Sequence, residues 1–436
     1  MTLQISVIAY ILITILIALS RKSESDNINY IFAGRKLTTP AFIMTLVATW
    51  YGGILEIGRF SYEYGVVSWL IFGVFYYLAA ILYSFFLVPK ISSSNFQTIP
   101  EAFKETYGKW CGLIAAMIVL FIVSPAPYLK ILSIIIEYVY QINPFTAIIV
   151  GSIISMFYTI RGGFRSVIAT DKLQFILMYS GFAVVLAYLY LNYGGYQFLS
   201  SNLPSPKLSI PGDLNWSYIF VWGFIAMVTF IDPNFYQRSF AGASRETIQS
   251  GIYLSVALWF LFDLMSISVG LYAAAIIPET QSSPYLELGS IILPPAIQAL
   301  FVISMLSVVM STIDSFIFIS GFTIGKDILS NFITGHQNST HHTKIGIVVT
   351  AMISVILATF FENALDIWYV MGSFGVSAIF IPLLCVFYEK NLNYPLLMLI
   401  IPTVVTMLWF IFPLYPIDPM YPGLSISFIC FLLFRR

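Results

Sequence analysis

Residues 296–324 read AIQALFVISMLSVVMSTIDSFIFISGFTI, an apolar run whose only formal charge is Asp314. A run of this length predicts a helix that crosses a membrane, because helices satisfy their own backbone hydrogen bonds in lipid. Its middle, Ser311 to Ser315, carries three hydroxyls and one carboxylate. Polar groups at that depth cost several kcal/mol unless they pair, line a water path or bind an ion. The pentapeptide therefore indicates a functional site, and its oxygen atoms suggest a small hard cation.

The whole chain has the composition of a membrane protein. Of its 436 residues 59% are hydrophobic and 9% are charged, and the mean hydropathy is +0.89. The formal net charge is zero and the basic residues are scattered, which argues against a nucleic-acid partner and leaves the lipid bilayer as the expected surroundings. We find no HExxH motif and no Ser, His and Asp set in a shared apolar region, so we expect no enzymatic activity.

Division into spans of about 18 to 20 apolar residues predicts an all-α, polytopic membrane protein with about thirteen transmembrane helices. The expected ranges are 3–20, 39–66, 67–90, 109–140, 143–160, 166–192, 214–240, 246–278, 286–328, 343–361, 365–388, 394–413 and 420–434.

The distribution of Lys and Arg predicts the orientation. If the N-terminus lies outside and the spans alternate, nearly all loop Lys and Arg residues fall in inner loops, among them Arg161, Arg165 and Arg238. Only Lys207 falls in an outer loop. The positive-inside rule therefore favours a multi-pass protein of the cell membrane with the N-terminus outside and the C-terminus in the cytoplasm.

Three predicted helices contain helix breakers in their middle. The second has Gly52-Gly53, the fourth has Pro125-Ala126-Pro127, and the seventh has Trp222-Gly223 followed by Asp232-Pro233. A glycine pair in a membrane helix has two interpretations: close packing against a neighbouring helix, or an unwound segment whose free carbonyls coordinate an ion or solute. Both remain open at this point.

The most specific motif lies between the fifth and sixth predicted helices. It reads Gly162-Gly163-Phe164-Arg165-Ser166-Val167-Ile168-Ala169-Thr170-Asp171-Lys172-Leu173-Gln174, with Met178 one turn later. This resembles the signature of the sodium/solute symporter family, which has a glycine pair, a small residue and Val, then Thr-Asp, a Gln three residues later and a Met four beyond. Ser166 stands where Ala is commoner in the family.

Three further segments resemble the family in the expected order, and together they extend the resemblance over most of the chain. They are Asn29–Arg35, Thr98–Phe103 and Asp232–Ala241. The resemblance implies a single transporter domain over 1–436 with the LeuT-type fold, in which two five-helix repeats of inverted topology bind solute and ions near the midplane. The repeats would be 39–192 and 214–388. One peripheral helix, 3–20, would precede them, and two helices in 394–434 would follow.

The resemblance also implies a first sodium site. Family members hold Na⁺ between the broken first core helix and the eighth core helix, which here gives the carbonyls of Ala48, Tyr51 and Val308 and the hydroxyls of Ser311 and Thr312. Five oxygens without a formal charge suit a monovalent cation, whereas Ca²⁺ prefers more carboxylates. The alternative is that both hydroxyls only bond back to carbonyls one turn earlier.

A second sodium site, which some family members carry, would use Asp171, Ser311, Asp314 and Ser315. Asp314 departs from the family, which often has a hydroxyl at that position. Two carboxylates facing each other in a low dielectric favour a cation between them or a proton on one of them. The site could therefore take Na⁺ or a proton, or Asp314 could pair elsewhere.

The predicted solute site surrounds the break in the second helix. Its residues are Gly52, Gly53, Glu56, Arg59, Tyr76, Lys130 and Trp222. The region 72–76 lacks the polar side chains of sugar carriers, which disfavours a hexose, while two cations beside one anion suit a carboxylate. The alternatives are an ion pair between Glu56 and Arg59 within one helix, and a Lys130 that extends its amine to the membrane surface or pairs with Glu137 two turns away.

These features predict a sodium-coupled secondary active transporter that imports a small polar organic solute by alternating access. The charges favour a carboxylate-bearing solute, an amino acid or an organic acid. Two alternatives stay open: a solute-sensing membrane module of the same fold without net transport, and a proton-coupled symporter. The identity of the solute, the number of sodium ions and the oligomeric state do not follow from the sequence.

Overall fold

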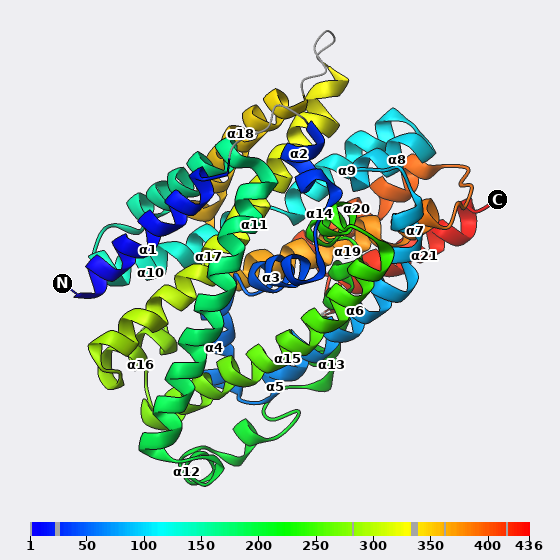
Figure 1. The fold of residues 1–436 in the computed structure, drawn as a ribbon. Coiled ribbons are helices and arrows are strands. Elements are labelled where there is room, and N and C mark those ends of the chain that lie inside the picture. The colour runs from blue at the N-terminus through cyan, green and yellow to red at the C-terminus, as the bar shows by residue number, and fades with distance from the viewer. Residues whose placement is uncertain (1, 22–26, 281–282, 333–338, 362, 416) are drawn as a thin grey trace.

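The computed structural model describes residues 2–21, 27–280, 283–332, 339–361, 363–415 and 417–436, and within these ranges the chain is helical without a β-strand (Figure 1). The first half contains α1 Thr2–Leu19, α2 Asn27–Phe32, α3 Thr39–Trp50, α4 Ile54–Tyr64, α5 Val67–Trp69, α6 Phe75–Phe86, α7 Val88–Ser93, α8 Ile99–Tyr107, α9 Lys109–Ile122, α10 Ala126–Tyr140, α11 Pro144–Tyr193 and α12 Tyr196–Asn202. The second half contains α13 Trp216–Ile225, α14 Pro233–Ala241, α15 Arg245–Ile276, α16 Pro284–Ile292, α17 Pro295–Phe322, α18 Ser339–Phe360, α19 Ala364–Phe387, α20 Pro395–Ile411 and α21 Met420–Phe434.

The helices are those of a multi-pass membrane protein. Nine helical segments of the described residues are long and apolar enough to cross a membrane, and the bent pair of α3 and α4 makes ten. The apolar helices α20 and α21 are shorter than a full span. Large apolar side chains such as Leu16, Phe85 and Leu191 are exposed on the outside, as expected for a surface that faces lipid.

The long helix α11 changes direction inside the glycine motif. Gly163 has φ +60° and ψ −154°, outside the helical region, so the helix is divided into two parts at this residue. A Cβ atom on Gly163 would lie 2.6 Å from the backbone oxygen of Tyr30, which belongs to α2. Glycine is required here because the backbone conformation and the close approach of α2 both exclude a side chain.

The break predicted at Gly52-Gly53 is present. α3 ends at Trp50, α4 begins at Ile54, and the two helices meet at 60°. A Cβ on Gly52 would lie 2.6 Å from the Cβ of Thr312, and a Cβ on Gly53 would lie 1.8 Å from the ring of Trp368. The glycine pair therefore serves both purposes: the helix is interrupted, and the interruption packs closely against α17 and α19.

Three predicted helices are interrupted at prolines. In the range 109–140, α9 ends at Ile122 and α10 begins at Ala126, directly after Pro125. The range 286–328 contains the end of α16 at Ile292 and the start of α17 at Pro295, because Leu293 and Pro294 are extended. The range 214–240 contains α13, a 3₁₀ segment from Ala226 to Phe230, and then α14, which starts at Pro233. The proline ring removes the backbone donor that a continuous helix needs.

The helix α17 forms the centre of the molecule. Residues 304–322 of this helix are all buried, and its principal neighbours are α11, α18, α1, α3 and α10. The first helix, α1, packs on α11 and α17 at the edge of the bundle, and α20 and α21 pack on each other and on α19. The two chain ends lie on opposite sides of the molecule (Figure 1).

Candidate functional site

The pentapeptide Ser311 to Ser315 lies in the part of α17 that meets the break between α3 and α4. Its four polar side chains are all completely buried. The hydroxyl of Thr312 lies 2.8 Å from the carbonyl oxygen of Thr49 and 3.1 Å from that of Val308. Thr312 therefore bonds back to the preceding turn of α17, which is one of the two alternatives that the sequence left open. The same hydroxyl also bonds to the last turn of α3.

The other predicted ligands of the first sodium site are gathered at this junction. Ala48 and Val308 are fully buried, and Tyr51 is 2% exposed. Tyr51 caps the C-terminus of α3, and its hydroxyl donates to the carbonyl of Trp259 on α15 at 2.9 Å. This hydrogen bond fixes the position of Tyr51, the residue at which the backbone leaves the helical conformation of α3.

Asp171 lies beside the same turn of α17. Its Oδ1 accepts a hydrogen bond from Ser311 at 2.6 Å, and its Oδ2 accepts one from Thr45 on α3. Arg238 Nη2 lies 3.7 Å from Asp171 Oδ2, and both side chains are completely buried. The signature aspartate therefore joins α11, α3, α14 and α17 in one polar network.

Arg238 occupies a different position from the one predicted. The sequence placed its charge in an inner loop, but it lies in α14 at 0% exposure. Its Nη2 donates to Thr49 at 2.7 Å, Ser315 at 3.0 Å and Thr45 at 3.0 Å. The loop assignment was wrong because helix length alone placed Arg238 at the end of its span, whereas α14 is turned into the core at the Asp232-Pro233 break.

Asp314 makes its contact on another side of α17. Its Oδ2 accepts a hydrogen bond of 2.5 Å from Tyr158 of α11, and its Oδ1 has no hydrogen-bond partner among the described residues. No described hydrogen bond joins Asp314 to Asp171. The structure therefore brings Asp171, Ser311 and Ser315 into one network, and it pairs Asp314 with a tyrosine.

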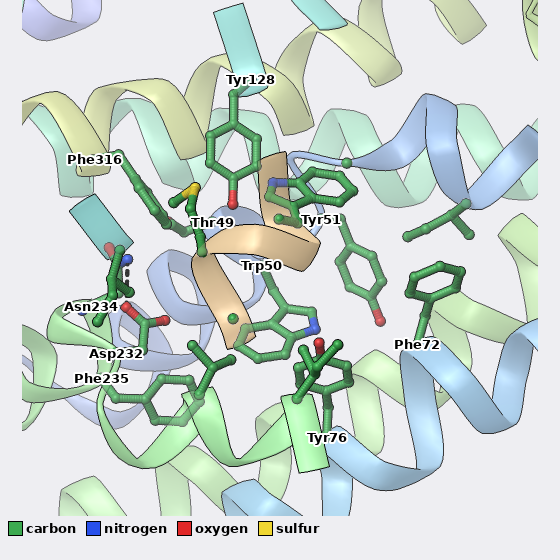
Figure 2. Close-up of a pocket in the computed structure, with 18 of the residues that line it drawn as sticks. Thr49, Trp50, Tyr51, Phe72, Tyr76, Tyr128, Asp232, Asn234, Phe235 and Phe316 are labelled. Carbon is green, nitrogen blue, oxygen red and sulfur yellow. Dashed lines mark hydrogen bonds between the residues drawn. The ribbon is translucent and has the colours of Figure 1, made fainter. Parts of the chain in front are cut away.

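A cavity of about 160 Å³ adjoins the break (Figure 2). Three of the predicted solute residues line it: Gly53, Tyr76 and Trp222. The other four do not. Gly52 packs on Thr312, Lys130 is not among the lining residues, and Glu56 forms an ion pair of 3.1 Å with Arg59 one turn along α4.

Most of the cavity wall was not predicted. Aromatic side chains dominate it, and Asp232 and Asn234 lie together at one edge (Figure 2). Asp232 was noted in the sequence as part of a helix breaker and of a segment that resembles the family, and not as a solute residue. Trp368 of α19 had no sequence signal, because its place in the wall depends on how α19 packs over Gly53.

Broken helices that meet around buried oxygen ligands and a central cavity define a class of membrane protein, the secondary transporters. Within that class, the chain belongs to the sodium:solute symporter family, whose model matches residues 30–395. The resemblance seen in the sequence motifs is thereby confirmed. The protein is a transporter and not an enzyme, and Na⁺ is its coupling ion.

Several curated proteins are similar to this chain. The human high affinity choline transporter 1 is 21% identical over 89% of this chain and 73% of its own length. The sodium/proline symporter of Haemophilus influenzae is 22% identical over 81% and 75%. The sodium/pantothenate symporter of Escherichia coli is 24% identical over 86% and 83%. A solved structure of a Na⁺-coupled sialic acid symporter, in a substrate-bound outward-open state, has a TM-score of 0.83 at 14% identity, covers 99% of this chain and 96% of its own, and shares the fold.

Proposed function

We propose that the protein imports a small polar organic solute together with Na⁺ by alternating access. Family membership establishes sodium-coupled transport of a solute. The observation that carries the rest is the close contact between the α3–α4 break and the hydroxyl turn of α17, where Gly52 leaves no room for a side chain beside Thr312. An ion held at that contact links two helices that belong to different halves of the chain.

The proposed ligands of the first Na⁺ are the carbonyls of Ala48, Tyr51 and Val308 and the hydroxyls of Ser311 and Thr312. Both hydroxyl protons already have acceptors, since Ser311 donates to Asp171 and Thr312 to backbone carbonyls. The oxygen lone pairs are left to face a cation. A site of neutral oxygens binds a monovalent ion without holding it too tightly for release.

Ion binding and solute binding would be coupled because one segment of the chain contacts both sites. Thr49, Trp50, Tyr51 and Gly53 line the cavity, and the same turn contributes the carbonyls proposed for the ion. Na⁺ bound at α17 would fix the conformation of this segment and so raise the affinity for solute. By linkage, bound solute would raise the affinity for Na⁺ by the same factor.

A second coupling ion, either Na⁺ or a proton, is a separate proposal. Sodium at Asp171, Ser311, Asp314 and Ser315 requires Arg238 to release Ser315 and Asp314 to turn from Tyr158. A proton on Asp314 requires neither change, because the carboxyl already contacts a hydroxyl. The proton-coupled alternative therefore depends on Asp314 alone, whereas the sodium alternative depends on both Asp171 and Asp314.

We further propose the thirteen-helix arrangement, with two five-helix inverted repeats and one helix before and two after. The division of α11 at Gly163, the bent pair of α3 and α4, and the short apolar helices α20 and α21 support this count. The predicted orientation, with the N-terminus outside, belongs to the same proposal.

The solute class predicted from the sequence loses its support. The preference for a carboxylate rested on Arg59 and Lys130, and neither lines the cavity. The relatives do not decide the matter, because choline, proline and pantothenate are a cation, a zwitterion and an anion.

The test is uptake by the purified protein in lipid vesicles. A labelled solute that binds in Na⁺ but not in K⁺ should accumulate above its external concentration under an inward Na⁺ gradient. Binding without net uptake would instead support the sensing alternative.

A further inference from the structure

The described residues of the cavity wall carry negative charge and no positive charge. Among the described residues that line it, Asp232 is the only one with a formal charge, and no Lys or Arg is present. Nine of the other nineteen lining residues are aromatic. From this combination we infer that the solute carries a substituted ammonium group, held by the aromatic rings and the Asp232 carboxylate. The inference rests on the proposed transport function and names its solute class.

The aromatic rings are arranged around the break as a cage. Trp50 meets Tyr76 edge to face at 5.3 Å and Phe235 at 5.7 Å between ring centroids. Across the break, Tyr128 meets Phe316 at 4.9 Å. Ring faces attract cations, and cages of this kind bind ammonium groups whose methyl substituents leave no N–H to donate. An uncharged apolar solute would gain only contact area from the same rings.

Asp232 supplies the opposite charge. It is the N-cap of α14, and its Oδ1 accepts hydrogen bonds from the backbone and side-chain nitrogens of Asn234, both at 2.9 Å. Its Oδ2 has no hydrogen bond among those described, and Figure 2 shows the carboxylate at the edge of the cavity. One oxygen therefore holds the helix end, and the other is free to face a ligand.

The buried cation Arg238 attracts the Asp232 carboxylate through space, but no ion pair between the two is found among the described residues. The Arg238 guanidinium contacts Asp171, Thr45, Thr49 and Ser315 through Nη2, and its Nη1 donates to Asn234. A carboxylate beside an aromatic wall is stabilised when a cation enters, whereas an anionic solute would meet a like charge in a low dielectric.

The size of the cavity fits a compact ammonium compound. At about 160 Å³ it is close to the volume of roughly 150 Å³ known to hold one benzene molecule. A trimethylammonium group with a short polar arm is of this size.

The test uses three probes of one shape with the full-length protein in Na⁺ buffer. They are choline, its uncharged isostere with a tert-butyl group in place of trimethylammonium, and the anion tert-butylacetate. Binding is measured by thermal shift and by calorimetry. We expect choline to bind at least about tenfold more tightly than the uncharged isostere, and the anion to bind more weakly still. Equal binding of choline and its uncharged isostere, or stronger binding of the anion, would overturn the inference.

The variant Asp232→Asn removes the charge of Asp232 and keeps its structural role. Asn is as good an N-cap as Asp, so the cap of α14 is kept. We expect the affinity for choline to fall about tenfold and the affinity for the uncharged isostere to stay the same. Asp366→Asn is the matched control. Asp366 is an exposed acid in the first turn of α19, and other residues of that helix line the cavity. An Asp232→Asn protein that is stabilised by Na⁺ and binds choline like the wild type would contradict the role of Asp232.

The stabilisation by Na⁺ distinguishes a failure of the proposed function from a failure of the proposed solute class. If Na⁺ does not stabilise the wild-type protein more than K⁺ does, the proposed function fails. If Na⁺ stabilises it and choline shows no advantage over its isostere, only the solute class fails.

Discussion

Thr312 is the residue at which the proposed ion site and the contact between α3 and α17 meet. Its hydroxyl reaches both its own helix and the last turn of α3, and it lies directly beside Gly52. A hydroxyl that only bonds back along its own helix contributes little to binding, so the contact across helices is the informative one.

Replacing Thr312 by Val keeps the shape and removes the oxygen. We expect the Kd for Na⁺ to rise at least about tenfold, or about 1.4 kcal/mol, in a titration followed by thermal shift. Thr14→Val is the control, because Thr14 is equally buried and its described hydrogen bond goes to the carbonyl of Tyr10 within α1. Equal sodium affinities in the two variants would remove Thr312 from the site.

Arg238 and Asp171 are expected to depend on each other for stability. Removing one partner of a buried ion pair leaves the other charge unpaired, at a cost of about 3–5 kcal/mol. Arg238→Gln and Asp171→Asn should each lower the unfolding temperature strongly, and the double variant should lose less than the sum. Additive losses in this double-mutant cycle would show that the 3.7 Å contact does not couple them.

At the residue scale, the sequence could predict which side chains share a turn. Ser311 and Thr312 are neighbours in the chain, so the fold that brings this turn of α17 to α3 brings both hydroxyls close to it. Their role as Na⁺ ligands stays a prediction. Asp314 and Arg238 show the limit. Whether Asp314 faces Asp171 or Tyr158 depends on the rotation of α17 against α11, and the burial of Arg238 depends on the path of α14. Neither follows from local sequence.

At the scale of elements, glycines and prolines determine where the helices break. The breaks at Gly52-Gly53 and within the Gly162-Gly163 motif could be predicted, since glycine pairs interrupt apolar runs there. The gap at Leu293 and Pro294 was missed because the hydropathy stays high through it. Lining residues on distant helices, such as Trp368, could not be predicted, since their position depends on tertiary packing.

Gly163→Ala tests the division of α11. The positive φ and the approach of Tyr30 should make this change cost about 1–3 kcal/mol, seen as a lower unfolding temperature. Gly289→Ala in α16 is the control, because the nearest atom to its added Cβ would be 3.6 Å away. Two variants of equal stability would show that the chain tolerates a continuous helix at Gly163.

For the whole molecule, the proposed topology places the two chain ends on opposite sides of the membrane, and they lie on opposite sides of the fold (Figure 1). An epitope tag at the N-terminus should be reached by antibody on intact cells. A tag at the C-terminus should be reached only after permeabilisation. Access to both tags, or to neither, on intact cells would require an even number of spans.

The central claim is that Na⁺ at the junction of α3 and α17 drives solute uptake. The most direct measurement is the accumulation of labelled choline in vesicles that contain the purified protein, with an inward Na⁺ gradient and with equal Na⁺ on both sides. We predict accumulation above the external concentration only with the gradient, and its loss in Thr312→Val. Uptake that is the same with and without the Na⁺ gradient, or that Thr312→Val leaves unchanged, would contradict this account.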